Sequence, residues 1–138
     1  MPGNRYFKNV TGCKIAVHES GVEVLEKKLW PNLHLTKHGI PSRTVKVDRS
    51  LRDGDVISLG KYDFQILHTP GHTSDSICVS VNMGSKKVLF SGDTILAEGL
   101  IGEFGATVDF SEYLKSIEKI TELKIDVLLP GHRVFVLS

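Results

Sequence analysis

The sequence predicts an α/β protein in which helices pack in layers against a mixed β-sheet. Short apolar segments with the period of two that is typical of strands recur between residues 44 and 90. Segments with helical spacing of apolar residues precede and follow them, and one more apolar strand comes last. Because helices and strands both bury an apolar face against a neighbouring layer, this order of elements favours the α/β class.

Length and composition indicate one globular domain. The 138 residues suit an ordinary domain, and 41% hydrophobic with 24% charged residues is typical of a folded chain. A formal net charge of +1 gives no electrostatic reason to expect nucleic acid or an anionic membrane as a partner. The apolar runs are too short to cross a bilayer and the N-terminus lacks a secretory signal, so we expect a cytoplasmic protein.

The first predicted elements are a strand and a helix. Residues 14–18 form the strand. Ser20 and Glu23 have the spacing of a capping box, in which each side chain bonds a free backbone N–H group of the other residue. A helix is therefore predicted from Ser20, and Pro31 ends it.

An irregular segment separates this helix from a series of strands. Residues 31–43 contain two prolines and one glycine, and we interpret His34 and His38 as solvated loop residues. Turn residues, such as those of the Asp-Gly-Asp run at residues 53–55, then separate apolar segments. The predicted strands are residues 44–47, 56–59, 64–67, 77–81 and 88–90.

The last predicted elements are a second helix and a buried strand. A glycine-rich segment over residues 92–105 is typical of a surface loop or a lid over a site. Asp109 is the predicted N-cap of the helix, with Glu112 three residues on. Residues 125–129 form the strand, which Pro130 and Gly131 end. The predicted buried face of the helix consists of Leu114, Ile117 and Ile120.

Three loops place a candidate metal ligand directly after an apolar strand. His72 lies in the run His-Thr-Pro-Gly-His-Thr, Asp93 in Ser-Gly-Asp-Thr, and His132 ends the run Pro-Gly-His. Strand ends in layered α/β folds face a common crevice, and the neighbouring glycines permit tight turns and close approach. Imidazole and carboxylate groups together suit zinc, or iron where coordination positions stay open.

These three runs, in this order, resemble the later signature motifs of the metallo-β-lactamase superfamily. The resemblance extends from the strand at Lys14 to Arg133 and implies the αββα sandwich of that fold. It also implies that His72 ligates one metal ion, that Asp93 is the catalytic carboxylate that bridges two ions, and that His132 ligates the second. The implied cofactor is Zn, with Fe or Mn as alternatives.

The family's His-x-His-x-Asp-His element is absent from this sequence. Residues 1–7 resemble the helix that follows that element, and relatives continue past His132 into another helix. We therefore expect residues 1–138 to form a single partial domain that is truncated at the N-terminus. Because such a truncation uncovers a sheet face or edge, we predict a homo-oligomer or a complex with a fragment that carries the missing portion.

Other polar residues near the motifs receive supporting roles. His68 and Thr73 are predicted to support the site without binding metal, because a Pro-Gly turn separates His68 from His72. His18 is interpreted as a histidine at a strand end, and Cys78 as a small buried residue. The sequence does not assign the substrate-binding residues.

Three functions remain open. The first is a hydrolase similar to the glyoxalase II-like branch, in which a metal-bound hydroxide attacks an ester, thioester or lactone of a small-molecule substrate. The stretch between Asp93 and His132 leaves no space for the domain of the nuclease branch, and residues 99–103 lack the arginine typical of glyoxalase II. The second is a catalytically incomplete remnant that serves as a structural or binding module. The third is a mononuclear iron oxygenase-like protein, since those relatives retain equivalents of His72 and Asp93.

Overall fold

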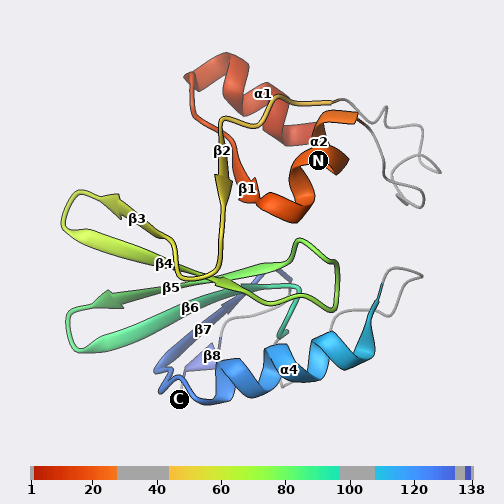
Figure 1. The fold of residues 1–138 in the computed structure, drawn as a ribbon. Coiled ribbons are helices and arrows are strands. Elements are labelled where there is room, and N and C mark those ends of the chain that lie inside the picture. Colours follow the sequence, from red (N-terminus) through yellow and green to blue (C-terminus); the bar gives the residue numbers. More distant parts are fainter. Residues whose placement is uncertain (1, 28–43, 97–107, 133–135, 138) are drawn as a thin grey trace. The chain divides into compact units, whose positions relative to one another are not determined.

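The computed structural model describes residues 2–27, 44–96, 108–132 and 136–137 of the chain (Figure 1). The chain forms two compact units, Met1–Leu51 and Arg52–Ser138. The expectation of one domain over residues 1–138 stays a prediction. Within the described ranges, no helix has the length and the apolar character that a bilayer crossing requires. Most of the predicted glycine-rich segment, the irregular residues 31–43 and the predicted helix end at Pro31 lie outside these ranges.

The first unit is built on a small parallel sheet. Its two strands pair in register, with Ala16 opposite Arg49 and His18 opposite Leu51. The predicted first strand is therefore confirmed, although it begins two residues later than expected. The elements are α1 (Pro2–Thr11), β1 (Ala16–His18), the 3-10 helix η1 (Glu19–Gly21), α2 (Val22–Lys27) and β2 (Arg49–Leu51).

The predicted capping box at Ser20 is wrong. The chain turns one residue earlier, at Glu19, and the N-cap is His18, whose Nδ1 accepts from the backbone N–H of Ser20. His18 Nδ1 also lies 2.8 Å from Ser20 Oγ, and the His18 side chain is buried. Glu23 instead forms an ion pair with Lys27, one helical turn further on. A strand-end histidine thus takes the capping position from the serine.

The predicted strand over residues 44–47 is also wrong, because β2 begins only at Arg49. The backbone N–H of Val45 donates to Leu25 O, and that of Val47 donates to Glu26 Oε1. Val45 is buried. The alternation of apolar and polar residues over 44–47 therefore belongs to a segment that forms hydrogen bonds with α2. It does not belong to a strand of a sheet.

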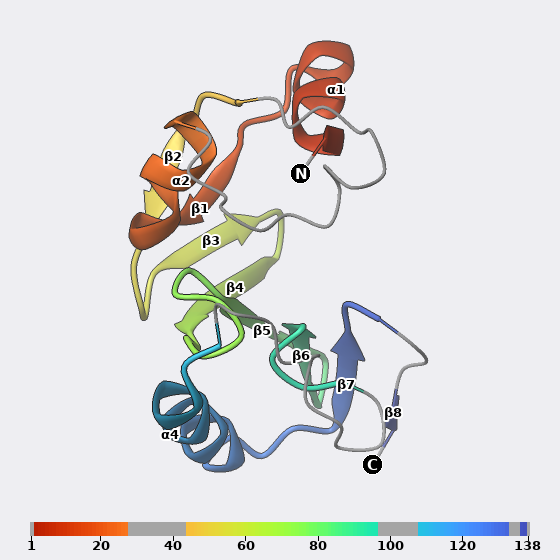
Figure 2. The ribbon, with the colours of Figure 1, turned by 90° about the vertical axis from the view of Figure 1, so that its right-hand side faces the viewer.

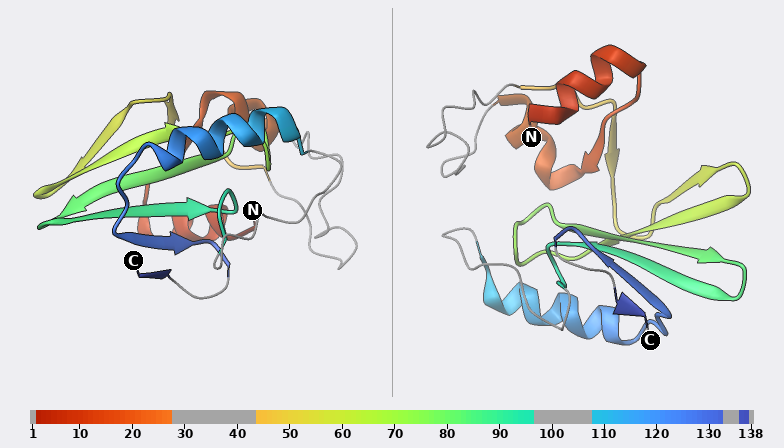
Figure 3. Two further views of the ribbon diagram at one scale, coloured as in Figure 1. Left: turned by 90° about the horizontal axis from the view of Figure 1, so that it is seen from below. Right: turned by 180° about the vertical axis from the view of Figure 1, so that it is seen from behind.

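The second unit contains a six-stranded sheet with the strand order β3-β4-β5-β6-β7-β8. Only the β6–β7 pair is parallel. Helix α4 (Phe110–Thr121) lies along one face of this sheet, as Figure 2 and Figure 3 show from different sides. The strands are β3 (Val56–Leu59), β4 (Tyr62–His68), β5 (Ile77–Met83), β6 (Lys86–Gly92), β7 (Val127–Pro130) and β8 (Val136–Leu137).

Five strands of this sheet are confirmed, and one was not predicted. The expected segments 56–59, 64–67, 77–81 and 88–90 all lie inside observed strands, most of which extend further. The last predicted strand begins at Val127, two residues late, and is half-buried where burial was expected. β8 adds an unpredicted outer strand.

Helix α4 begins as predicted, and the predicted burial of its residues is confirmed at Ile120 but not at Leu114. Asp109 is the N-cap, and its Oδ1 accepts from the backbone N–H groups of Ser111 and Glu112. The hydrogen bond from Glu112 is the largest of several that hold the pKa of Asp109 below its ordinary value. Leu114, predicted to be buried, is 50% exposed. The buried residues are Tyr113, Ser116 and Ile120.

The core lies between α4 and the sheet. Leu67, Cys78 and Leu89, from three neighbouring strands, pack with Ile120 of the helix. Cys78 has no exposed surface, which confirms its predicted burial. Partly buried residues extend this cluster toward the chain's end: Ile95, Leu123, Ile125 and Leu128.

The different burial of two residues of α4 predicts different losses of stability when each is truncated to alanine. Ile120→Ala should lower the free energy of unfolding by about 2–5 kcal/mol, because it removes a buried side chain from the core. Leu114→Ala, on the same helix but half exposed, should change it by no more than about 0.5 kcal/mol. Urea unfolding of both variants tests this. Equal losses would contradict the observed helix face.

Candidate metal centre

The three predicted ligands follow strands that run in one direction. β4 and β6 are both antiparallel to β5, which lies between them, and β7 is parallel to β6. The C-terminal ends of β4, β6 and β7 therefore lie at one edge of the sheet. His72 lies in the loop after β4, Asp93 directly follows β6, and His132 comes two residues after β7. Strand direction alone thus gathers residues that are far apart in the sequence.

The carboxylate of Asp93 lies between two imidazoles. Asp93 Oδ2 is 3.8 Å from His72 Nε2, and Asp93 Oδ1 is 3.3 Å from His132 Nε2. Asp93 Oδ1 is buried and accepts no hydrogen bond from the described part of the chain. The side chains of His72, Asp93 and His132 are 27%, 35% and 74% exposed, so the centre opens to solvent on the side of His132.

This geometry suits part of a two-metal site. Two donors on one tetrahedral zinc ion, each bound at about 2.0–2.1 Å, lie roughly 3.4 Å apart. The two N···O distances are close to this value, so each oxygen of Asp93 and the histidine beside it fit two positions on one ion. Zinc sites use three or four protein ligands. Among the described residues, no group of three or more His, Cys, Asp or Glu residues offers such a set. The donors present therefore offer two ligands for each of two ions, which is fewer than a complete zinc site uses.

Glycines bring the Asp93 and His132 turns together. The β6–β7 ladder shifts register between Phe90 and Gly92, an irregularity that re-aims the next side chain. The backbone N–H of Gly131 donates to Gly92 O at 2.7 Å. A Cβ atom at Gly131 would lie 3.1 Å from Asp93 Oδ1, so the absence of a side chain there lets the carboxylate approach the turn.

The loop that carries His72 is closed by its own polar side chains. His68 Nε2 lies 2.9 Å from Ser74 O, which joins the loop's first and last parts. The backbone N–H of Thr73 donates to Ser76 Oγ, and the two hydroxyls are 2.8 Å apart. His68 and Thr73 thus shape the loop on either side of His72. Their predicted contribution to metal binding stays a prediction.

A carboxylate–lysine pair supports the base of this loop. Asp53 Oδ1 accepts from the backbone N–H of His68 at 2.7 Å and from Lys119 Nζ, which also donates to His68 O. Burial by itself raises the pKa of the Asp53 carboxyl, but the hydrogen bonds from Lys119 and His68 outweigh it and hold the pKa below its ordinary value. Neither residue was predicted to support the site, because in the sequence Asp53 has the appearance of a turn residue and Lys119 that of a surface lysine.

Buried polar groups connect the His72 and Asp93 loops. The hydroxyls of Thr69 and Thr94 lie 3.2 Å apart, and Thr69 Oγ1 donates to Cys78 Sγ. Burial raises the pKa of the Cys78 thiol, which therefore stays protonated at neutral pH. A protonated, buried thiol is a structural group and not a nucleophile.

Two residues of α4 were also missed at this site. Tyr113 OH donates to Thr94 O, and Ser116 Oγ donates to Pro70 O at 2.7 Å. The spacing of Tyr113, Ser116 and Ile120 is itself a helical face, so the periodicity carried this signal. Tyr113 was nevertheless not predicted to be buried, because the next residue, Leu114, is more apolar and was assigned to the buried face of the helix instead.

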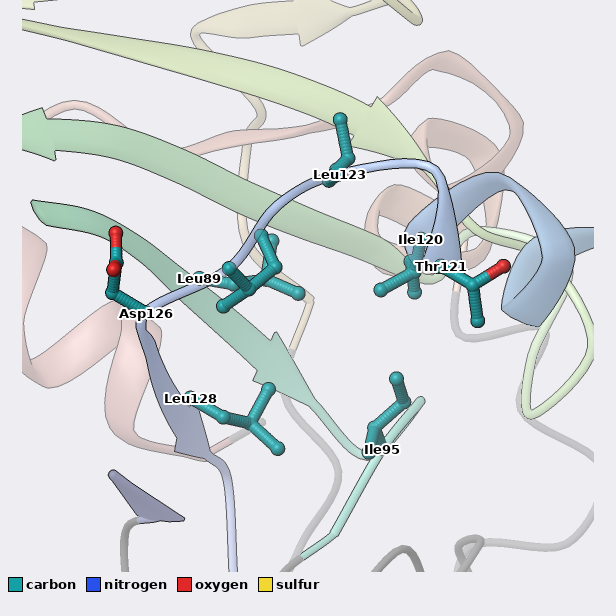
Figure 4. A pocket seen from close by; sticks show the side chains of 8 residues that line it. Leu89, Ile95, Ile120, Thr121, Leu123, Asp126 and Leu128 are labelled. Carbon is teal, nitrogen blue, oxygen red and sulfur yellow. The ribbon is translucent and has the colours of Figure 1, made fainter. Parts of the chain in front are cut away.

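An apolar pocket is lined largely by residues of the core described above. Its volume is about 260 Å³, and Figure 4 shows that its lining comes from β6, β7, the end of α4 and the segment after that helix. The Asp126 carboxylate accepts from the backbone N–H of Lys87, and the Thr121 hydroxyl donates to Glu118 O. None of the three candidate ligands lines this pocket. The lining residues are Leu89, Ile95, Ile120, Thr121, Leu123, Ile125, Asp126 and Leu128.

Comparison with known proteins gives a consistent result. The model of the metallo-beta-lactamase superfamily matches residues 3–132. The chain is 36% identical over 92 residues to an acyl-coenzyme A thioesterase, MBLAC2, of Gallus gallus. The aligned region covers 64% of this chain and 32% of that protein. The chain is also 31% identical over 116 residues to a hydroxyacylglutathione hydrolase of Francisella tularensis subsp. novicida (strain U112). The aligned region covers 83% of this chain and 44% of that protein.

A solved structure has the same fold. BJP-1, a subclass B3 metallo-beta-lactamase of Bradyrhizobium japonicum, superposes with a TM-score of 0.75 and 26% identity, covering 96% of this chain and 52% of that one. The predicted metallo-β-lactamase-like fold is therefore confirmed. The chain spans less than half the length of the two curated relatives and about half of this solved chain.

The hydrogen bonds of Asp53 predict a pH-dependent contribution to stability. Because its folded pKa is lowered, the charged form stabilises the fold fully above the unfolded pKa of about 3.9, and the contribution is lost as pH falls through the folded pKa. Asp53→Asn should therefore cost about 1 kcal/mol at pH 7 and progressively less below pH 4, measured by urea unfolding. Asp75→Asn, which removes a carboxylate from the His72 loop, is the control. A cost that does not change with pH would contradict the prediction.

Gly71 predicts a second stability effect. Its φ is +136°, and a Cβ there would lie 2.5 Å from Tyr113 Cα. Gly84, with a φ of +64° and no atom within 4 Å of its Cβ position, is the matched control. Gly71→Ala should lower the free energy of unfolding by at least about 2 kcal/mol more than Gly84→Ala, because a steric overlap adds to the backbone strain. Equal losses would show that the Tyr113 contact tolerates a methyl group.

Proposed function

The chain belongs to the metallo-beta-lactamase superfamily, and we propose that it carries part of the active site of a metal-dependent hydrolase. In this proposal His72, Asp93 and His132 are metal ligands. The observation that carries it is the position of the Asp93 carboxylate, whose two oxygens face two different imidazoles at distances suited to shared coordination.

Each of the three residues has a distinct part in this proposal. Asp93 would hold both ions, and its negative charge would partly neutralise theirs. His72, the less exposed imidazole, provides the inner ligand, and His132 provides a ligand at the solvent side, where a substrate can approach. The chemistry that bound zinc supplies is the lowering of the pKa of a coordinated water to about 7, which gives hydroxide at neutral pH. Fe and Mn are the alternative metals.

The substrate class that we propose is an acyl thioester. Two relatives have names that describe acyl groups carried on a thiol, those of coenzyme A and glutathione. Esters and lactones require the same attack on a carbonyl carbon and are the other candidates. Since residues 99–103 lack an arginine, we rank coenzyme A thioesters before those of glutathione.

A second candidate function follows from the count of ligands. Each ion has only two donors among the described residues, and a change in a group that merely supports a ligand already lowers metal affinity 10–100-fold. This count favours a module without turnover when the chain is alone. The predicted homo-oligomer or complex would then supply the further ligands.

Metal analysis separates these functions. The chain, purified without chelator, should contain two equivalents of zinc if it is a two-metal hydrolase, one iron if it is oxygenase-like, and none if it is a module without turnover. Asp93→Ala should lose the bound metal, with at least a 100-fold fall in affinity, because it removes a ligand from both ions. The same preparations are then tested for release of free thiol from an acyl-coenzyme A thioester.

The control variant is Asp63→Ala, which removes an exposed carboxylate from the second residue of β4, beside the β3–β4 turn. Equal metal content in wild type and Asp93→Ala would contradict the assignment of ligands. Equal losses in Asp93→Ala and Asp63→Ala would show that binding depends on charge and not on the site.

A further inference from the structure

One buried side chain contacts both loops that carry candidate ligands. Tyr113 is 2% exposed, and its hydroxyl donates to the backbone carbonyl of Thr94, the residue after Asp93. On its other side Tyr113 lies against Gly71, the residue before His72. A Cβ at Gly71 would lie 2.5 Å from Tyr113 Cα and 2.7 Å from Tyr113 Cδ2. The backbone of the His72 loop therefore rests directly on this residue.

The same helix holds the His72 loop at two further points. Ser116, 3% exposed and one turn after Tyr113, donates its hydroxyl to Pro70 O. The backbone N–H of Asp109 donates to Gly71 O at 2.9 Å. These bonds fix the segment from Pro70 to Gly71 on the start of α4. Since a helix is a rigid element, the position of this loop is then set by the helix.

We propose that Tyr113 is a positioning residue for the metal centre. It joins the His72 loop, which α4 holds, to the Asp93 loop, and it thereby sets the distance of 3.8 Å between His72 Nε2 and Asp93 Oδ2. This inference rests on the proposed function, because the distance matters for binding only if the two residues share an ion. A phenylalanine at this position keeps the ring against Gly71 but leaves Thr94 O without its donor.

The test compares Tyr113→Phe with Ile120→Val in the full chain. Ile120 lies on the same buried face of α4, where it packs in the apolar core with Leu67, Cys78 and Leu89, so Ile120→Val lowers stability by a different route. Zinc affinity is measured by competition with a chromophoric chelator, and the stability of the metal-free protein by urea unfolding. We expect Tyr113→Phe to bind zinc on the order of tenfold more weakly than wild type, and Ile120→Val to bind as wild type.

Two further measurements separate positioning from stability. Substituted Co²⁺ should show a shifted visible absorption in Tyr113→Phe, because the ligand geometry changes. Amide hydrogen exchange of the metal-free chain should become faster at residues 71–73 and 92–95 in Tyr113→Phe but not in Ile120→Val. Ser116→Ala should also weaken zinc binding, since it releases the same loop from α4.

The outcomes distinguish this inference from the proposed function. A wild-type chain that binds no zinc overturns both. Zinc binding by wild type with an unchanged affinity in Tyr113→Phe overturns the inference alone, whatever the exchange rates are. An equal loss of affinity in Ile120→Val would show that stability and not position is responsible, and it also overturns the inference.

Discussion

The parallel pairing of β6 with β7 is the constraint on which the candidate centre depends. Two parallel neighbours end at the same edge of a sheet, so Asp93 and His132 meet although a long connection separates them. The connection must cross one face of the sheet, and α4 is the part of it that packs there. The helix that makes the parallel pairing possible is also the one whose side chains bond to both ligand loops. Architecture and site are therefore determined by the same element.

The features that were predicted correctly are those that a short-range rule determines. Asp109 caps α4 because its own side chain reaches the next N–H groups, and the ligand loops follow apolar strands because glycines permit sharp turns there. The gathering of His72, Asp93 and His132 at one edge was expected from the rule that strand ends face a common crevice and from the family resemblance. These features can be predicted without knowing which residues far apart in the sequence contact one another.

The errors arose where a distant or competing partner decides. The segment with Val45 and Val47 alternates like a strand, but its N–H groups bond to α2. The pairing of Asp53 with Lys119 joins residues that are 66 positions apart, so no local pattern reveals it. Leu114 of α4 was wrongly predicted to be buried, because the neighbouring Tyr113, whose hydroxyl donates to Thr94 O, takes the buried position. In each case a hydrogen bond to a partner outside the local pattern decided the structure.

The two cysteines differ in solvent accessibility, so their reaction rates with a thiol reagent measure how often the core becomes exposed. Cys78 has no accessible surface, whereas Cys13 is exposed. A thiol-reactive dye added to the folded chain therefore labels one position, and the second becomes available only when the sheet separates from α4. The rate at which the second label is incorporated measures how often the interior opens. No residue has to be replaced to obtain this measurement.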